Sequence, residues 1–264
     1  MAADNSPVSQ MSLFGNEAAM GFQSMVHDLR QDLARYRYKL KQPTLAIILL
    51  FPGFQAVALY RISRWLDTRH RRGLWWLPVR LLEAVVTRIA EIITGIYISP
   101  NAQIGPGLYF PHFGCIFIGN YSVIGKNCDI YQGVTLGYSG RQEDGGYPVV
   151  GDRAVVAAGA KVLGPIHIGN DAAIGANAVV TKSMPEHAVV MGIPGKVHSR
   201  RGSFDLIRYP GYQEDPERID SLARQAEQQQ ESERFPQQRN MSEGVPLQIS
   251  SVDYPYGLRT ENVR

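Results

Sequence analysis

Few residues in this chain have side chains suited to acid–base chemistry near neutral pH. The chain holds six histidines and two cysteines in 264 residues. His112, His167 and His187 lie in its middle part, together with Cys115 and Cys128. An imidazole has a pKa near neutrality and therefore suits a general base that takes the proton of a hydroxyl group. The two cysteines match neither a disulfide framework nor a metal site, so we expect no metal.

His112 is the preferred candidate for such a base because of its place in a repeat. Aliphatic residues recur at every sixth position between Ile98 and Val190, and glycine often follows them. The repeat slips by two residues between Phe110 and Ile118, and His112 lies in this slip, where a coil can turn a side chain outward. A merely exposed histidine, or one at a subunit contact, is the alternative interpretation, and both stay open at this point.

The six-residue period also predicts the fold. It is neither the 3.6 of a helix nor the 2 of a strand, and it is typical of a parallel β-helix. Each unit predicts one short strand and a corner, and three units make one triangular coil. We expect a mainly β protein with about five coils stacked roughly 4.8 Å apart. The in-phase positions are Ile98, Ile104, Phe110, Ile118, Ile124, Ile130, Leu136, Val150, Val156, Val162, Ile168, Ile174 and Val180.

The rest of the chain divides around this repeat. We expect a disordered N-terminus over residues 1–24, a helical cap over 25–95, the β-helix over 96–200 and a polar, largely flexible tail over 201–264. The net charge of +3 gives no reason to expect a nucleic-acid partner. The N-terminus lacks the pattern of a signal peptide, so a cytoplasmic location is expected.

Two apolar segments in the predicted cap raise the question of a membrane. The segment 44–60 carries no charge, but Pro52-Gly53 in its middle predicts a break into two helices. The segment 74–93 is interrupted by charged residues. The favoured interpretation is a cap that packs on the β-helix and on a neighbouring subunit. Membrane proximity stays open because of the Arg- and Trp-rich stretch between and beside these segments, which contains Arg61, Arg64, Arg69, Arg71, Arg72 and Arg80 near Trp65, Trp75 and Trp76.

One excursion leaves the repeat. Residues 137–148 break the six-residue step, and their Gly, Ser, Glu and Asp content indicates an external loop. Loops that project from a rigid scaffold often carry functional residues.

Several motifs resemble a known family. They are Phe51-Pro52-Gly53-Phe54-Gln55-Ala56, Tyr131-Gln132-Gly133-Val134-Thr135-Leu136-Gly137, Gly159-Ala160-Lys161-Val162-Leu163-Gly164 and Gly192-Ile193-Pro194. In this order they resemble the hexapeptide-repeat acyltransferases, and most closely the short bacterial serine acetyltransferases. The resemblance covers residues 42 to 200 or so. It implies a left-handed β-helix, a homotrimer or a dimer of trimers, and acetyl-CoA as co-substrate in the groove between neighbouring prisms.

The resemblance places the family's catalytic histidine at His112, but the partners of that histidine are replaced. Pro111 and Tyr97 stand where the family has aspartates, and Gly146-Tyr147 stands where it has an Arg-His pair. Tyr97 or Tyr147 is therefore the candidate to bind the imidazole or the acceptor, and Glu143 or Asp144 is the candidate to orient the ring.

The acetyl-CoA side follows the family more closely. Small residues at these positions let an extended pantetheine arm approach the backbone, although ordinary corner packing explains them equally well. The implied contacts are Ala157, Gly159, Ala160, Lys161, Gly175 and Ala176 for pantetheine, and Lys196, with Arg200 and Arg201 behind it, for the CoA phosphates.

The resemblance therefore implies an acetyl-CoA-dependent O-acetyltransferase that acts on the L-serine hydroxyl in cysteine biosynthesis. A small-molecule hydroxyl acceptor of another class, a sugar or a surface-polysaccharide precursor, is the first alternative. A catalytically silent β-helix scaffold is the second. A β-helix carbonic anhydrase is disfavoured because the repeat lacks the histidine pairs that would bind zinc. The tail ends Glu261-Asn262-Val263-Arg264 rather than in isoleucine, so we expect no complex with the next enzyme of cysteine synthesis.

Overall fold

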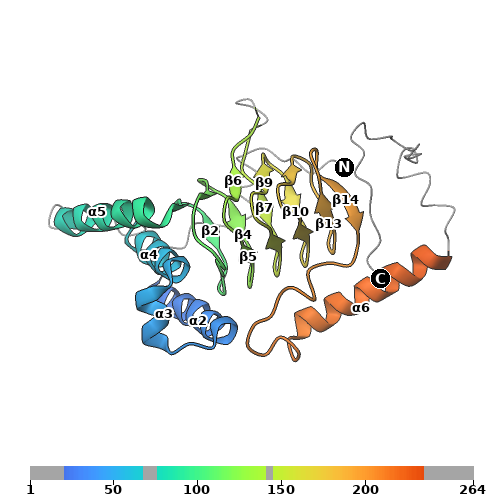
Figure 1. Cartoon of the computed structure of the whole chain (residues 1–264), viewed down its shortest axis with the longest axis horizontal. Coiled ribbons are helices and arrows are strands. Elements are labelled where there is room, and N and C mark those ends of the chain that lie inside the picture. Colours follow the sequence, from blue (N-terminus) through green and yellow to red (C-terminus); the bar gives the residue numbers. More distant parts are fainter. Residues whose placement is uncertain (1–20, 68–75, 141–144, 235–264) are drawn as a thin grey trace, which may run out of the picture. The chain divides into compact units, whose positions relative to one another are not determined.

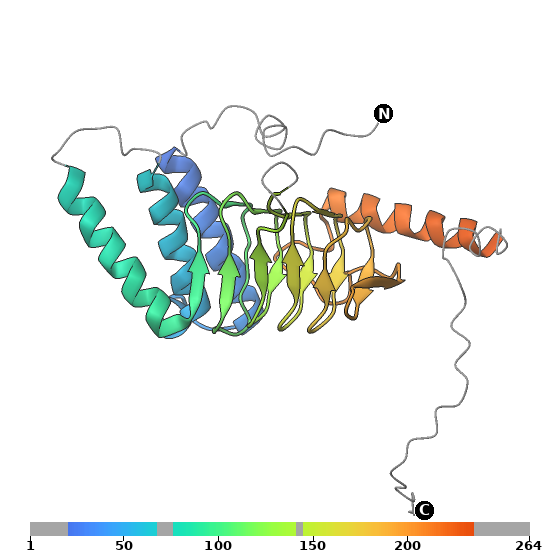
Figure 2. The same ribbon diagram turned by 90° about the horizontal axis from the view of Figure 1, so that it is seen from above.

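The fold is given by a computed structural model, which describes residues 21–67, 76–140 and 145–234. Residues up to Ser221 form one compact unit, in which helices lie at one end of a stack of short strands (Figures 1 and 2). Residues 1–20 of the predicted disordered N-terminus (1–24) and residues 235–264 of the predicted flexible tail (201–264) lie outside the described residues. The described residues 22–24 already belong to the first helix.

The cap consists of helices in the predicted segments. They are α2 (Phe22–Leu40), α3 (Thr44–Leu50), α4 (Pro52–Asp67) and α5 (Leu77–Thr94). Pro52 starts α4, which confirms the predicted break, because proline suits a first helical turn and interrupts a helix interior. Over the described residues no single helix is long and apolar enough to cross a membrane. The pair α3 and α4, bent by 86°, meets that test by length and composition alone.

The strands form a left-handed β-helix with three sheets. Sheet A contains β1 (Ile96–Ile98), β3 (Ile116–Ile118), β6 (Thr135–Gly137), β9 (Lys161–Leu163) and β12 (Val179–Val180). Sheet B contains β2 (Gln103–Ile104), β4 (Val123–Ile124), β7 (Val149–Val150) and β10 (His167–Ile168). Sheet C contains β5 (Asp129–Ile130), β8 (Val155–Val156), β11 (Ala173–Ile174), β13 (Val189–Met191) and β14 (Lys196–Ser199).

Each coil contributes one strand to sheet A, and the five strands of this sheet confirm the predicted five coils. Successive strands pair in parallel and in register, as Ile118 opposite Leu136 and Leu136 opposite Val162 show. These three residues are fully buried and stack in the prism's interior. The turn 192–195 ends the array, because β14 returns antiparallel to β13.

Buried ion pairs attach the cap to the first coils. Arg61 on α4 pairs with Asp32 on α2 at 2.9 Å. A carboxylate oxygen of Asp32 also accepts hydrogen bonds from the backbone N–H groups of Gly107 and Leu108. Arg35 pairs with Asp129 on β5 at 2.6 Å. Helix α2 therefore buries Asp32 and Arg35, because these charges have partners on α4 and in the β-helix.

The prediction of a largely flexible tail from residue 201 is wrong for residues 203–221. Ile207 and Tyr209 pack on the outer side chains of sheet C, Val155 and Ala173. The hydroxyl of Ser221 donates to Asp171 at 2.6 Å. This segment is ordered because its few apolar residues cover a sheet face. The chain continues through helix α6 (Pro216–Arg234).

Candidate active site

The site is built on one edge of the prism, where the chain passes from sheet C to sheet A. We call it the C–A edge, and it comprises the corners 111–115, 131–133, 157–159 and 175–177. Backbone hydrogen bonds connect each corner to the next: Gly133 N to Gly114 O at 3.0 Å, Gly159 N to Gln132 O at 2.9 Å, and Asn177 N to Ala158 O at 2.9 Å. His112 and the predicted pantetheine contacts therefore lie along one continuous edge.

His112 projects from this edge because its corner is longer than the others. Three residues separate the inward-facing Ile130 from Val134, and the next two corners have the same length. Five residues separate Phe110 from Ile116 at the first corner. The insertion leaves His112 and Phe113 exposed. The slip in the repeat therefore predicted an outward-turned histidine, and the structure confirms it.

The His112 ring has one recorded neighbour, Tyr131 of the next coil. The two ring centroids lie 6.5 Å apart, with the planes tilted by 55°. Within the described residues, His112 forms no hydrogen bond or ion pair. The imidazole is therefore positioned by the backbone and by the neighbouring ring, and both its nitrogens are available to bound substrates.

The two predicted partners of His112 contact other aromatic rings instead. Tyr97 on β1 stacks on Phe117 of β3, with 4.9 Å between centroids and 13° between planes. Tyr147 lies at the opposite edge of sheet A, next to Tyr121 and Tyr138. This placement was not predictable from spacing along the chain, because it depends on which edge of the prism each corner occupies.

The external loop is anchored at its base. Ser139 and Gly146 exchange two backbone hydrogen bonds, at 3.2 and 3.1 Å, so the two ends of the segment lie side by side at the prism. The candidates Glu143 and Asp144 lie outside the described residues.

The predicted acetyl-CoA contacts divide into three groups. Ala157, Gly159, Gly175 and Ala176 lie on the C–A edge and are partly or fully exposed, as the prediction requires. Ala160 is fully buried in the prism core, so its side chain does not reach a bound ligand, and that prediction is wrong. The remaining two are lysines with separate surroundings.

Lys161 bonds to the C–A edge itself. Its ammonium donates to the carbonyl of Gly133 at 2.6 Å and to the hydroxyl of Thr135 at 3.0 Å. It therefore bridges neighbouring coils beside the predicted channel. Lys196 is exposed on β14, opposite Met191, and stays a candidate for the CoA phosphates.

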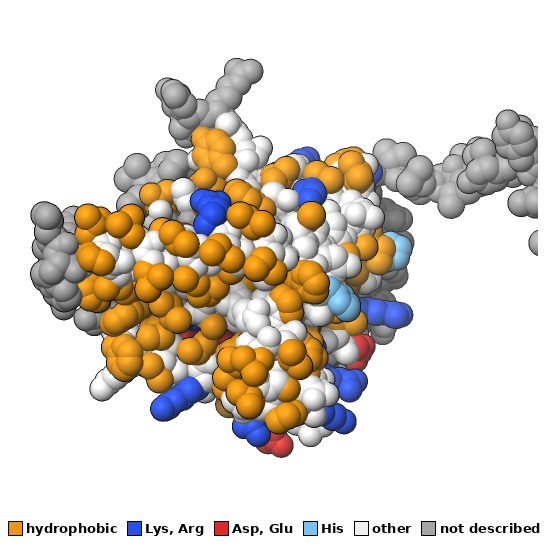
Figure 3. Space-filling view, turned by 60° about the vertical axis from the view of Figure 1, so that its left-hand side comes forward, with side chains coloured by type: hydrophobic (Ala, Val, Ile, Leu, Met, Phe, Trp, Pro, Cys, Tyr) orange, Lys and Arg blue, Asp and Glu red, His pale blue; other side chains and the backbone are white. Residues whose placement is uncertain are grey.

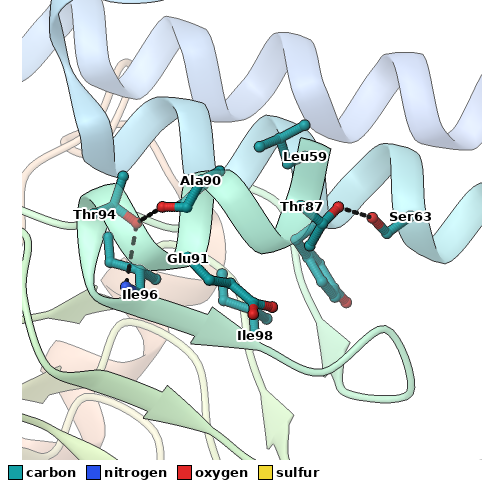
Figure 4. Close-up of a pocket in the computed structure, with 10 residues that line it drawn as sticks. Leu59, Ser63, Thr87, Ala90, Glu91, Thr94, Ile96 and Ile98 are labelled. Carbon is teal, nitrogen blue, oxygen red and sulfur yellow. Dashed lines mark hydrogen bonds between the residues drawn. The ribbon is translucent and has the colours of Figure 1, made fainter. Parts of the chain in front are cut away.

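A cleft lies between α4, α5 and β1 (Figure 4). Its polar side chains have partners within the cleft: the Thr94 hydroxyl donates to the backbone carbonyl of Ala90 at 2.7 Å, and the Ser63 and Thr87 hydroxyls lie 3.4 Å apart. None of the predicted site residues lines it. No group of His, Cys, Asp and Glu that could hold a metal ion occurs among the described residues.

Three further aromatic residues beside Tyr97 and Tyr147 were not predicted: Phe117, Tyr121 and Tyr138. The signal was available for Phe117, because residues one position before each in-phase aliphatic residue point outward. On sheet A these outward positions are Tyr97, Phe117, Thr135, Lys161 and Val179.

Comparisons with known proteins agree with this architecture. The family described as "Bacterial transferase hexapeptide (six repeats)" matches residues 147–182. The serine acetyltransferase of Mycobacterium tuberculosis is 42% identical over 175 residues, which are 66% of this chain and 73% of that protein.

Two solved structures are similar along the same part of the chain. A serine acetyltransferase in complex with cysteine has 32% identity and a TM-score of 0.59, over 67% of this chain and 71% of that one. A serine acetyltransferase in complex with CoA has 31% identity and a TM-score of 0.57, over 67% and 70%. The repeat, the C–A edge and these similarities lead to one conclusion: the chain belongs to the serine acetyltransferase family.

Proposed function

We propose that this protein transfers the acetyl group of acetyl-CoA to the hydroxyl of L-serine. The observation that carries the proposal is the placement of His112 on the same edge as a line of small, accessible corner residues. Ala157, Gly159 and Gly175 leave room for an extended pantetheine arm, and the arm would run along the edge toward the imidazole. The proposed setting is the cytoplasm, at the cysteine-biosynthesis step that activates serine.

The chemistry follows from the free imidazole. His112 takes the hydroxyl proton as the serine oxygen attacks the acetyl carbonyl carbon. The carbon–sulfur bond of the thioester then breaks, and the imidazolium returns the proton to the CoA sulfur. The products are O-acetyl-L-serine and CoA. An imidazole suits both steps because its pKa near neutrality lets it accept and release the proton.

The test is the release of free thiol from acetyl-CoA in the presence of L-serine. We expect His112→Asn to lower kcat/KM by about 10²- to 10⁴-fold, the usual contribution of a general base. His167→Asn is the matched control, because His167 is exposed on sheet B, away from the C–A edge. Equal activity of the His112 variant and the native protein would refute the assignment of the base.

We also propose that copies of this chain assemble as a homotrimer in which a neighbouring copy covers α5. This helix turns its polar side chains toward α4: Arg80 pairs with Asp67 at 3.1 Å, and Glu83 accepts a hydrogen bond from Ser63. Its apolar side chains point outward (Figure 3). The exposed ones are Leu77, Val79, Leu81, Leu82, Val85, Val86, Ile89, Ile92 and Ile93.

Apolar patches of this extent mark interaction surfaces. An amphipathic helix that lies on a membrane usually carries many basic residues on its polar face. On α5 the outward Arg88 is paired with Glu91 at 2.6 Å, and the polar face packs on α4. A protein surface of the same composition fits this helix better than an anionic bilayer.

Sedimentation of the purified protein tests the assembly. We expect three times the chain mass of 29.3 kDa for the native protein and a smaller particle for Leu82→Glu with Ile89→Glu. Arg88→Ala, on the same helix, is the control that leaves the trimer intact. Flotation with lipid vesicles that the double variant abolishes, with no change in particle mass, would favour the membrane instead.

A further inference from the structure

The proposed base, His112, has one described side chain beside its ring. The ring is exposed, and it forms no hydrogen bond or ion pair with the described residues. The Tyr131 ring lies 6.5 Å away, centroid to centroid, at a tilt of 55°. A side chain with two rotatable bonds samples several staggered conformations unless its surroundings select one. Whatever keeps the Tyr131 ring in place therefore also limits the conformations of His112.

Tyr131 is itself held by contacts on the outer face of sheet C. It follows β5 directly, and its backbone N–H donates to the carbonyl of Val156 on the next coil at 3.0 Å. Its partly buried ring packs against an apolar cluster that joins sheet C to the segment after the repeat. The members of this cluster are Val155, Ala173, Ile207 and Tyr209. One ring thus contacts both the proposed base and the cover of sheet C.

The segment that supplies two members of this cluster is attached at both of its ends. We call it the tail segment, residues 203–221. The backbone N–H of Ser203 donates to the carbonyl of Asp171 at 2.8 Å, and the Ser221 hydroxyl donates to the Asp171 carboxylate at 2.6 Å. Between these ends the two side chains of the cluster are buried. The tail segment is therefore a fixed part of the surface against which Tyr131 packs.

We propose that Tyr131 is a positioning residue for His112 and that the tail segment holds Tyr131 in place through Ile207 and Tyr209. The inference rests on the acetyl transfer proposed above, because it concerns the base of that reaction. It adds a part of the chain that lies beyond the repeat and contributes no group to the reaction itself. Turnover therefore depends on the packing of the tail segment on sheet C.

The contact depends on the Tyr131 ring and not on its hydroxyl. This hydroxyl forms no hydrogen bond with the described residues. Burial, and then the negative charge of Asp129, raises the pKa of Tyr131, so the phenol keeps its proton at neutral pH. Packing of the ring, rather than a proton or a hydrogen bond from the hydroxyl, is what restrains the imidazole. A phenylalanine ring at the same position should restrain it equally well.

The first experiment measures thiol release from acetyl-CoA with L-serine by the full chain. We expect Tyr131→Ala to lower kcat by about threefold to tenfold, the value of one aromatic contact expressed as a rate. The KM for acetyl-CoA should change by about twofold or less, because Tyr131 acts on the base and does not bind the ligand. Tyr131→Phe should retain the native rate. A raised KM with an unchanged kcat would show that Tyr131 binds the substrate and would overturn the inference.

A double-mutant cycle tests the contribution of the tail segment. Tyr209→Ala should lower kcat in the native protein and have little further effect in the Tyr131→Ala variant, because both changes release the same ring. Ile207→Val, which removes one methylene group, should act in the same way to a smaller degree without detaching the segment. Leu206→Ala is the matched control, since Leu206 is exposed in the same segment. Losses that simply add would overturn the coupling between the tail segment and His112.

Chemical modification of His112 gives a measurement that does not require turnover. Diethyl pyrocarbonate acylates accessible imidazoles, and mass spectrometry locates the modified residue. The rate at His112 is compared with the rate at His167, which is exposed on sheet B. It should rise in Tyr131→Ala and in Tyr209→Ala, because the neighbouring ring no longer limits access, and stay unchanged in Leu206→Ala.

The two kinds of measurement separate this inference from the proposed function. A native protein that does not acetylate serine would refute the proposed function, while faster modification in both variants would still show that the tail segment restrains His112. A Tyr131→Ala variant with the turnover and the modification rate of the native protein would overturn the inference and leave the proposed function standing.

Discussion

Sheet C and sheet A are formed by the same coils, but the outer face of sheet C is covered by other described parts of the chain and the outer face of sheet A is not. The outer side chains of sheet C are covered: Asp129 is paired with Arg35, and Val155 and Ala173 lie under Ile207 and Tyr209. The outer side chains of sheet A are Tyr97, Phe117, Thr135, Lys161 and Val179, and Phe117 is 43% exposed. Both sheets share the same buried interior.

The difference shows which surfaces of the prism serve stability and which are available for binding. On the outer face of sheet C, the charged groups are paired and the apolar groups are packed. Along sheet A and its edges, the tyrosine hydroxyls and the His112 imidazole have no hydrogen-bond partner among the described residues. Groups of this kind are expected where a substrate or a second copy supplies the missing contacts.

The largest effect on the free energy of unfolding is expected from breaking a buried ion pair beneath the cap. Asp32→Ala removes the partner of the buried Arg61 and the acceptor of two backbone N–H groups. Loss of one member of a buried ion pair costs about 3–5 kcal/mol of unfolding free energy. Urea denaturation measures it. Asp67→Ala, in the more exposed pair with Arg80, should cost about 0–1 kcal/mol. Similar values for the two variants would mean that the Asp32 pair does not hold the cap.

The second prediction compares neighbouring residues of β3. Ile118 is fully buried in the prism, whereas Phe117 points outward. Ile118→Ala should lower the unfolding free energy by about 2–5 kcal/mol, because it leaves a cavity. Phe117→Ala should lower it by about 0.5–1.5 kcal/mol, because it removes the stacking of Phe117 on Tyr97. Denaturation of both variants under one condition gives the difference. An equal loss in the two variants would show that the Phe117 ring contributes to stability as much as a core residue does.

The third prediction concerns the two thiols. Cys115 is exposed on the C–A edge, and Cys128 lies in the core, where burial raises the pKa of its thiol to about 12. A thiolate is the reactive form. An aromatic disulfide reagent should therefore modify Cys115 alone in the native protein and both thiols in denaturant. CoA should slow the modification of Cys115. Two reactive thiols in the native protein would contradict the buried position of Cys128.

The smallest effect is expected when the pH is lowered and the carboxyl groups of the tail segment, residues 203–221, become protonated. Burial is the largest influence on Asp215 and opposes its ionisation, but the hydrogen bonds from the Tyr209 hydroxyl and from the backbone N–H groups of Glu217 and Arg218, together with the charge of Arg153, outweigh it and lower the Asp215 pKa. The hydrogen bond from Lys126, at 2.8 Å, lowers the pKa of Glu217. A carboxyl group whose pKa is lower in the folded state stabilises that state at any pH above its ordinary pKa, which is 3.8 for Asp215 and 4.5 for Glu217. This stability is lost as the pH falls below the ordinary pKa and through the lowered one.

Hydrogen exchange of residues 203–221, expressed as protection factors, should therefore show loosening between neutral pH and about pH 3. Glu217→Gln should reduce the dependence on pH, and Glu214→Gln, an exposed neighbour, is the control. Protection that does not change over this range would rule out the proposed contribution of these carboxylates.

Much of the fold follows from the sequence alone. The six-residue period determines which residues face inward, because a stacked coil must place equivalent residues above one another. Pro52 determines the break between α3 and α4. The buried positions of Asp32 and Arg35 were not predictable, since a charged helix reads as a solvated one until its partners on other elements are known.

The candidate site was predicted in part. The slip in the repeat indicated an outward His112, and the small corner residues indicated the line along the C–A edge. Ala160 was misplaced because its neighbour Gly159 faces outward and Ala160 faces the core. Tyr147 was assigned to the imidazole because its distance along the chain does not reveal that the loop leaves from the other edge of sheet A.

The two-residue insertion at His112 has a consequence for how proteins of this shape change over evolutionary time. The insertion belongs to the first corner, at the end nearest the cap, and the later coils keep their regular corner length. Duplication or loss of a distal coil would lengthen or shorten the C–A edge and leave the histidine where it is. The length of the C–A edge can therefore change during evolution while His112 keeps its position.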